Sequence, residues 1–178
     1  VLAEHRRYIE LQRQALAAID RCAPVWGVHS IDELSIRLCP RTREREAAVR
    51  LGHEIKASLR ERVGESLRCT IGIAANRFLA KTACNLGKPD GLVVLDAATL
   101  RDRVLDKPVE DLTGIGTNMG RRLRDRGIHT VADLYRRSEP QLRAAWGGVT
   151  GTMWWDQLRG GPDYYDRPTS RQSISHGH

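Results

Sequence analysis

The chain has 178 residues, enough for one full domain or two small ones with a hydrophobic core. Its 29 Lys and Arg residues outnumber its 22 Asp and Glu residues, and the formal net charge of +7 favours nucleic acid or another polyanion over a membrane as a partner. A merely basic soluble protein is the alternative that charge leaves open. Because there is no apolar run of about 18 residues and no signal-peptide pattern, we expect a soluble chain with no membrane partner.

The four cysteines are Cys22, Cys39, Cys69 and Cys84, and no two of them form a Cys-X-X-Cys pair. Their spacing supports neither a zinc ribbon nor a thioredoxin-like redox motif. We expect buried, reduced thiols in a cytosolic protein. The chain begins with Val rather than Met, which indicates a fragment of a longer protein.

The first part of the chain is predicted to mix strands and helices. The expected elements are a helix over 2–21, strands over 25–30 and 34–38, a charged loop and amphipathic helix over 40–64, a strand over 67–74, a helix over 76–86 and a strand over 92–95. Asn76 is a suitable N-cap for the helix that follows it, and Gly87 a suitable stop. From 99 to about 160 only short helices are expected, so an α+β unit precedes a small helical unit.

Asp32 and Glu33 are adjacent carboxylates between two apolar stretches, PVWGV and LSIRL. Side chains of a regular strand alternate between faces, so both can address one ligand only where the chain turns. Strand signals on both sides predict a hairpin or bend at 31–34, with both side chains at least partly exposed. Acidic groups at such a bend can hold Mg²⁺, which prefers oxygen ligands. A surface turn carrying two charges is the simpler interpretation of the dipeptide alone.

Lys81 and Lys88 are seven residues apart, about two helical turns, and can project to a similar side. Lys88 stands between Gly87 and Pro89, on a tight turn beyond the predicted helix. A lysine fixed on a turn can contact a phosphate as a point charge. Two solvated surface lysines are the alternative.

The stretch DLTGIGTNMGRRLRDRGIHTVADL, 111–134, is typical of a helix-hairpin-helix that binds the DNA backbone without sequence preference. Its glycines allow positive φ and the close approach of a phosphate, and the first amides of the second helix would face that phosphate. Gly120 is expected to allow close helix packing and Leu123 to anchor the core. The candidate DNA-binding residues are Gly114, Ile115, Gly116, Thr117, Arg121 and Arg122. A simple helix connection is the alternative.

Three motifs, SIDE at 30–33, IGIAANRFLAKTACNLGKPDG at 71–91 and LTGIGTNMGRRLRDRGIHTVADL at 112–134, resemble the Y-family translesion DNA polymerases in order and spacing. The resemblance runs over nearly the whole chain. It implies an α+β fold in which 1–98 form a partial palm, a small β-sheet flanked by helices, and 99–166 form an all-helical thumb with the helix-hairpin-helix. Residues 167–178 resemble the linker toward a little-finger domain. The first palm strand, with its own metal-binding Asp, is expected upstream of residue 1.

The resemblance also implies an activity, template-directed DNA synthesis past lesions by nucleotidyl transfer with two Mg²⁺ ions, as part of DNA repair. Asp32 and Glu33 would be the catalytic metal ligands, Lys88 would bind the triphosphate of the incoming deoxynucleoside triphosphate, and Lys81 would lie near the DNA. Primer-template DNA is the implied partner in the bacterial cytoplasm, with a sliding clamp as a further candidate through regions outside the chain. Because two carboxylates hold two ions poorly, we expect the chain alone to be inactive or nearly so.

The chain departs from the family pattern directly after the acidic pair. Family members usually continue with Ala, an aromatic residue and, two places later, another Asp, whereas this chain has Leu34, Ser35, Ile36 and Arg37. The pair itself is intact, so the predicted metal site survives the change, but the strand beneath it is atypical.

Three other classes of protein compete with the polymerase interpretation. A helix-hairpin-helix glycosylase is suggested by Gly161-Pro162-Asp163, but this motif lies too far past the hairpin, in a turn expected to be exposed. A nucleotidyl cyclase with a palm-like fold would have no reason to carry a DNA-binding thumb. The strongest rival is a catalytically silent polymerase relative that binds DNA or recruits partners, although such relatives tend to lose the acidic pair.

Overall fold

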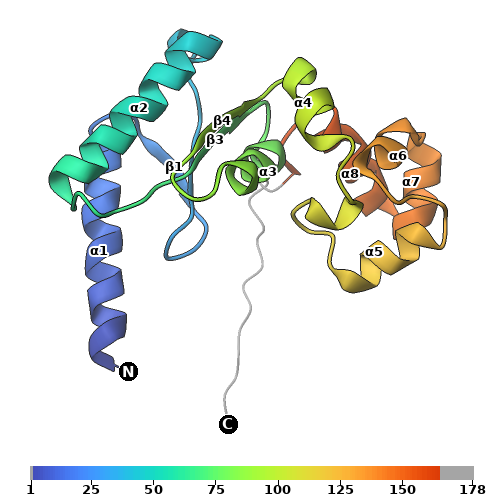
Figure 1. Cartoon of the computed structure of the whole chain (residues 1–178), viewed down its shortest axis with the longest axis horizontal. Helices are drawn as coiled ribbons and strands as arrows, with labels where there is room; N and C mark the ends of the chain where they lie inside the picture. Colours follow the sequence, from blue (N-terminus) through green and yellow to red (C-terminus); the bar gives the residue numbers. More distant parts are fainter. Residues whose placement is uncertain (1, 165–178) are drawn as a thin grey trace.

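The structure, a computed structural model, describes residues 2–164. Its first part alternates helices with short strands and packs two long helices beside two small sheets (Figure 1). The elements of this part are α1 (Leu2–Asp20), β1 (Val25–Val28), β2 (Leu34–Ile36), the 3₁₀ helix η1 (Pro40–Thr42), α2 (Arg45–Arg62), β3 (Ile71–Ala74), α3 (Arg77–Gly87) and β4 (Leu92–Leu95). The predicted order of helices and strands is confirmed, with shorter strands than expected.

The second part is helical and lies at the opposite end of the molecule from α1 (Figure 1). Its elements are α4 (Ala97–Val104), the 3₁₀ helix η2 (Val109–Asp111), α5 (Thr117–Arg124), α6 (Val131–Arg136), α7 (Glu139–Trp146) and α8 (Val149–Leu158). Within residues 97–164 the only β pairing is an isolated bridge between Pro108 and Thr130. The fold is therefore α+β followed by an all-helical unit, as predicted.

The two sheets each contain two strands. β1 and β2 form an antiparallel hairpin with Val28 opposite Leu34, so the turn between them carries the acidic pair. β3 and β4 are parallel, with Ile71 opposite Leu92, and α3 is the crossover between them. A Cβ at Gly72 would lie 2.0 Å from the carbonyl oxygen of Ala80, so only glycine lets α3 approach β3 this closely.

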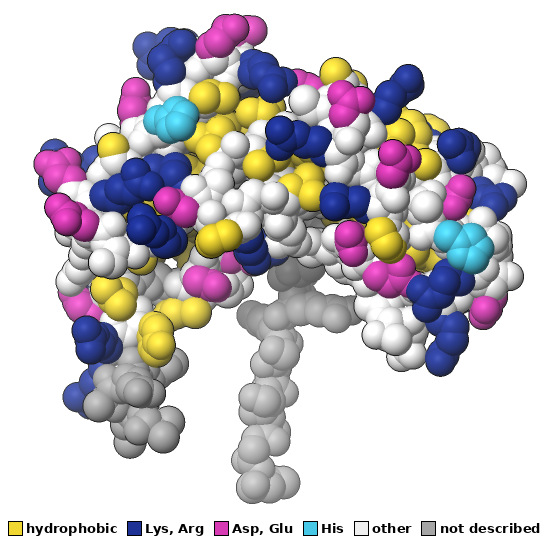
Figure 2. Space-filling view, in the orientation of Figure 1, with side chains coloured by type: hydrophobic (Ala, Val, Ile, Leu, Met, Phe, Trp, Pro, Cys, Tyr) yellow, Lys and Arg dark blue, Asp and Glu magenta, His cyan; other side chains and the backbone are white. Residues whose placement is uncertain are grey.

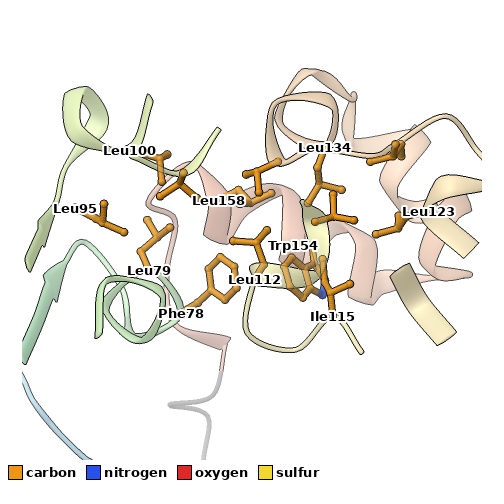
Figure 3. Close-up of a cluster of buried hydrophobic side chains, with 14 of the residues drawn as sticks. Phe78, Leu79, Leu95, Leu100, Leu112, Ile115, Leu123, Leu134, Trp154 and Leu158 are labelled. Atoms are coloured by element: carbon orange, nitrogen blue, oxygen red, sulfur yellow. The ribbon is translucent and has the colours of Figure 1, made fainter. Parts of the chain in front are cut away.

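The hydrophobic core is divided in two, and the division does not fall between the sheets and the helical unit. The larger core starts at α3 and β4 and continues through α8 into the helical unit (Figure 3). In it Phe78 meets Trp154 edge-on, with ring centroids 4.9 Å apart. The smaller core joins the C-terminal end of α1 to α2, including Ile19, Ile55 and Leu59. α3 is therefore held by the helical unit as much as by its own sheet.

Some local expectations are confirmed and others are wrong. The side chain of Asn76 accepts a hydrogen bond from the amide of Leu79 at 2.9 Å, which is the predicted cap. Ile9 is 40 % exposed, because only the last turns of α1 reach the core. All four thiols are free, but none is fully buried as we expected: Cys39 is exposed where it precedes η1, and Cys22, Cys69 and Cys84 are half-buried.

Within residues 2–164 no helix is long and apolar enough to cross a membrane. The predicted linker, 167–178, lies outside the described residues. In the structure α3 and the turns on either side of it lie in the middle of the molecule, between the α1–α2 part and the helical unit (Figure 1).

Candidate active site and nucleic-acid interface

The acidic pair lies on the turn of the β1–β2 hairpin, where the predicted bend is confirmed. The amides of His29 and Ser30 donate to the carbonyl of Glu33 at 2.8 and 3.2 Å, and these bonds close the turn. Asp32 is exposed and Glu33 is half-buried. Because the alternation of side chains stops at this turn, the two adjacent carboxylates are both accessible.

Asp32 is held in its ionised form. The hydroxyl of Ser30 donates to Asp32 Oδ1 at 2.6 Å, and this hydrogen bond is the main reason why the pKa of Asp32 lies below its usual value. The backbone amide of Asp32 and the positive charges of Lys81 and Lys88 lower the pKa further. Both predicted lysines are therefore within electrostatic reach of the acidic turn.

Glu33 forms an ion pair with Lys81. The ammonium of Lys81 lies 2.5 Å from Glu33 Oε2, and the two side chains are 31 % and 36 % exposed. We expected Lys81 to lie near DNA, but in the structure its charge is directed at the carboxylate. Such a half-exposed pair adds little stability, so its main effect is to fix where the Glu33 carboxylate lies.

A second contact ties the same hairpin to α3. Arg77 Nη1 donates to Nδ1 of His29 at 2.7 Å, and Nε2 of His29 is 2.9 Å from the hydroxyl of Ser35. Arg77 and Lys81 are four residues apart and so share one face of α3. The acidic turn is thus attached to α3 at two successive helical turns.

Lys88 is exposed on the turn that follows α3, as predicted, and this turn is fixed by a buried network from α2. Lys56, only 8 % exposed, donates to the carbonyl oxygens of Cys69 and Asp90 and to Asp90 Oδ1, the last at 2.6 Å. Arg60 donates to Asp90 Oδ2 at 2.8 Å. These contacts hold the residues beside Lys88 in place.

Sequence reasoning missed Lys56 and Asp90. The hydrogen bond from Lys56 and those from the Cys69 amide and Arg60 hold the pKa of Asp90 well below its usual range. A signal was present, because Lys56 directly follows Ile55 on the inward face of α2, where a lysine needs a partner. The partner lies 34 residues away and has no local signature.

The Gly161-Pro162-Asp163 motif has a structural role that differs from the exposed turn we expected. Both carboxylate oxygens of Asp163 accept from the amide of Arg77 at 2.9 Å, and Asn76 donates to the carbonyl of Gly161 at 2.9 Å. The motif therefore satisfies the free amides at the start of α3. Because the carboxylate of Asp163 is used to cap α3, the motif gives no support to the glycosylase interpretation.

The turn of the predicted helix-hairpin-helix is exposed and open. Gly114 has φ of +96°, which favours glycine, whereas Gly116 has an ordinary φ of −82° and a Cβ there would meet no atom within 4 Å. Gly116 is the N-cap of α5 and has no side chain to satisfy the first amides of the helix. Of the two glycines, Gly114 alone uses the positive φ that glycine allows.

The side chain of Ile115 points into the larger core and is only 5 % exposed (Figure 3). Its backbone amide donates to the carbonyl of Leu112 at 3.1 Å, so Ile115 anchors the turn with both its side chain and its amide. Gly120 packs against Glu110 so closely that a Cβ would lie 2.4 Å from Glu110 Oε1, and Glu110 in turn pairs with Arg124. This confirms the close packing expected at Gly120.

The arginines of α5 divide into two groups. Arg124 is engaged with Glu110, whereas Arg121 and Arg122 are exposed, with the guanidinium of Arg122 beside Gly147 at the end of α7. Arg121 donates to Asn118 Oδ1 at 3.3 Å, a weak contact that leaves most of its guanidinium available. Exposed guanidinium groups beside free helix amides form a surface suited to phosphate.

The acidic turn offers a metal ion two carboxylates. Oxygen is the donor that Mg²⁺ prefers, so Asp32 and Glu33 fit such an ion in the kind of ligand. Among residues 2–164 no group of three or more His, Cys, Asp and Glu side chains could hold a metal ion.

The sequence matches two family descriptions. Residues 1–85 match the impB/mucB/samB family and residues 110–161 match the thumb domain of DNA polymerase iota. Together with the palm-like first part and the helical second part, these matches define a nucleic-acid polymerase class. The chain belongs to the Y-family of DNA polymerases.

Relatives with 30 % identity or more carry the name DNA polymerase IV. One from Pelotomaculum thermopropionicum is 30 % identical over 82 % of this chain and 36 % of the relative, and one from Pseudomonas paraeruginosa is 36 % identical over 82 % of this chain and 41 % of the relative. The chain thus spans less than half the length of these curated relatives.

The fold agrees with solved structures of the same group. The crystal structure of DinB from Sulfolobus solfataricus has a TM-score of 0.70 and 24 % identity, covering 87 % of this chain and 45 % of that one. A post-insertion binary complex of Dbh DNA polymerase has a TM-score of 0.74 at the same identity and coverage. These likenesses establish the fold.

Proposed function

We propose that the chain is the second part of the palm, 1–98, and the thumb, 99–166, of a DNA polymerase that copies templates past lesions. The observation that carries the proposal is the β1–β2 turn. It presents Asp32 and Glu33 side by side, with Lys81 bound to Glu33 and Lys88 within electrostatic reach of Asp32. Two adjacent carboxylates with two lysines close by suit nucleotidyl transfer to a triphosphate better than they suit a surface turn without a ligand.

Each proposed residue has a separate role in this reaction. Asp32 and Glu33 provide carboxylate oxygens for Mg²⁺, together with a third acidic ligand beyond the described residues. When bound, Mg²⁺ lowers the pKa of the primer 3′-hydroxyl and neutralises charge on the phosphates. Lys81 orients Glu33, and Lys88 supplies a point charge to the triphosphate of the incoming deoxynucleoside triphosphate.

The thumb is proposed to hold the primer-template duplex by its phosphates. The proposed contacts are the backbone of Gly114, Gly116 and Thr117 at the start of α5 and the guanidinium groups of Arg121 and Arg122. Work in DNA repair in a bacterial cytoplasm, and contact with a sliding clamp through regions outside this chain, belong to the same proposal.

A second candidate is a catalytically silent relative that binds DNA or recruits partners. It is favoured by one observation, that the Glu33 carboxylate is already paired with Lys81. The polymerase and the silent relative differ in the role of the acidic pair. The polymerase requires Asp32 and Glu33 for primer extension, whereas the silent relative has no reaction that depends on them.

The test is primer extension by the full-length parent protein carrying Asp32→Ala or Glu33→Ala. We expect extension to be abolished and DNA affinity to be nearly unchanged, because duplex binding rests on phosphate contacts elsewhere. Asp102→Ala, an exposed carboxylate on α4, is the matched control and should extend normally. Extension within about tenfold of the parent in both acidic variants would favour the silent relative.

A further inference from the structure

A groove of about 410 Å³ lies between α2, β4 and α4. Its lining includes no residue of the acidic turn or of the thumb turn. Along β4, Val93 and Leu95 belong to the larger core with α3, so Leu92 and Val94 face the opposite side of the sheet. The groove is therefore a separate surface on the α2 side of β4.

The groove combines an apolar floor with a cationic rim. Its apolar lining comes from β4 and from Val49 of α2, and its polar lining is Arg45, His53, Thr99 and Arg103. Figure 2 shows the hydrophobic area between α2 and α4 with basic side chains around it. Arg45 pairs with Asp96, whereas within residues 2–164 Arg103 has no acidic partner. The rim thus has positive charge to offer to a ligand.

The third feature of the groove is the open edge of β4. Within the described residues β4 pairs only with β3. The amide of Ile71 donates to the carbonyl of Gly91 at 3.0 Å, so the backbone groups of Gly91 face β3. In a parallel pair the backbone groups of successive residues point to opposite sides of the strand. The amides and carbonyls of Leu92 and Val94 therefore point away from β3. The carbonyl of Val94 accepts from the hydroxyl of Thr99 at 3.1 Å, and the amides of both residues and the carbonyl of Leu92 face the edge.

We propose that this groove binds an extended acidic peptide segment of a partner protein, which adds to the edge of β4 as a further strand. The backbone of the peptide would pair with Leu92 and Val94, as in other cases of strand addition. Its carboxylates would meet Arg103 and His53, and its apolar side chains would cover the floor. A nucleic acid fits less well, because it offers no strand-like row of amides and carbonyls and leaves the apolar floor uncovered.

The proposal is independent of catalysis and is tested on the chain as it stands. The probe is a fluorescein-labelled synthetic peptide of alternating Glu and Val, followed by fluorescence anisotropy. Arg103→Glu should weaken binding by about tenfold or more, because it places a negative charge opposite the carboxylates of the peptide. Arg101→Glu is the matched control, since Arg101 is exposed on the same helix but does not line the groove, and it should bind as the parent does. Equal weakening by both variants would overturn the proposal.

A second measurement tests strand addition without changing the protein. Two versions of the peptide carry N-methyl groups on alternate amides, one set for each edge of the strand. We expect one version to lose binding and the other to keep it, because only one edge pairs with β4. Equal binding of both versions and of the unmodified peptide would contradict the pairing. Displacement of the peptide by a short oligothymidylate at equal charge would instead identify a nucleic-acid surface and would also overturn the proposal.

Discussion

The two candidate functional turns of the molecule, the acidic turn and the thumb turn, are held in opposite ways. The acidic turn is positioned by side chains of α3 that come 48 residues later in the chain, through Arg77 on His29 and Lys81 on Glu33. The thumb turn is held locally: the amide of Ile115 donates to the carbonyl of Leu112 at 3.1 Å, and the side chain of Ile115 is buried in the larger core.

The difference shows which parts of the molecule each turn depends on. The acidic turn depends on the position of α3, and α3 is fixed in turn by the loop around Asp163 and by the larger core. The thumb turn depends on its own helices, on the larger core and on Asn85 near the end of α3, which donates to the hydroxyl of Thr113 at 3.1 Å. A change to the start of α3 should therefore disturb the acidic turn and leave the thumb turn intact, whereas a change to the thumb core should affect both.

The largest expected effect comes from Leu123→Ala in the core below the thumb turn. Leu123 is fully buried, so the substitution leaves a cavity and should lower the free energy of unfolding by about 3 kcal/mol. Urea denaturation measures this loss. Leu11→Ala on α1 removes the same atoms from a side chain that is 38 % exposed, and it should cost far less. Similar costs for the two variants would mean that the larger core does not support the thumb turn.

A smaller effect, followed through its pH dependence, is expected from Lys56→Met. The pKa of Asp90 is depressed in the folded chain, so the stability it contributes is complete above its unfolded pKa of about 4 and is lost as the pH falls below that value. Without Lys56 the pKa of Asp90 should move back toward normal, and the loss of stability in acid should become shallower. Urea unfolding from pH 5 down to pH 3, about the range in which Asp titrates, measures the slope.

Lys107→Met is the control for this prediction, because Lys107 is half-buried in the helical unit and has no ion pair among residues 2–164. Its acid slope should equal that of the parent. An unchanged slope in Lys56→Met would show that the network around Asp90 is not what fixes the turn beside Lys88.

Asp163→Ala should lower the free energy of unfolding by about 1 kcal/mol, because the amide of Arg77 loses its partner at the start of α3. Thermal unfolding of the chain measures this cost. Asp102→Ala, which removes an exposed carboxylate from α4, should be nearly neutral. If the acidic turn depends on α3 as argued, the amide resonances of residues 29–33 should shift in Asp163→Ala while those of 114–117 stay in place.

The smallest effect on stability is expected from Gly116→Val. Gly116 has an ordinary φ and open space where the new side chain would lie, so the free energy of unfolding should change by less than about 0.5 kcal/mol. The valine would nevertheless block the approach of a phosphate, and affinity for every duplex should fall to a similar extent. Affinity measured over a salt series tests this, with a steep salt dependence expected for the parent.

Gly114→Val provides the comparison within the same turn, because φ of +96° at Gly114 strains any other residue. This variant should lose both stability and affinity. Normal duplex binding by a folded Gly116→Val chain would show that the thumb turn only connects two helices and does not bind DNA.

The sequence alone determined the elements of this fold and both turns, because their signals are local. Asn76 caps the helix that follows it, strand signals on both sides of Asp32 and Glu33 require a turn, and a Gly-X-Gly stretch before a basic helix indicates an open hairpin. Each of these patterns spans only a few residues, so it determines the local backbone conformation without contacts from distant parts of the chain.

Only the tertiary structure decided which charges meet. Lys81 pairs with Glu33 and Asp163 caps α3 across 48 and 86 residues, and no periodicity in the sequence encodes such distances. The open edge of β4 likewise follows from its pairing with β3 alone within residues 2–164. The physical reason is that a side chain's partners are set by the packing of whole elements, and that packing depends on the shape of the entire core.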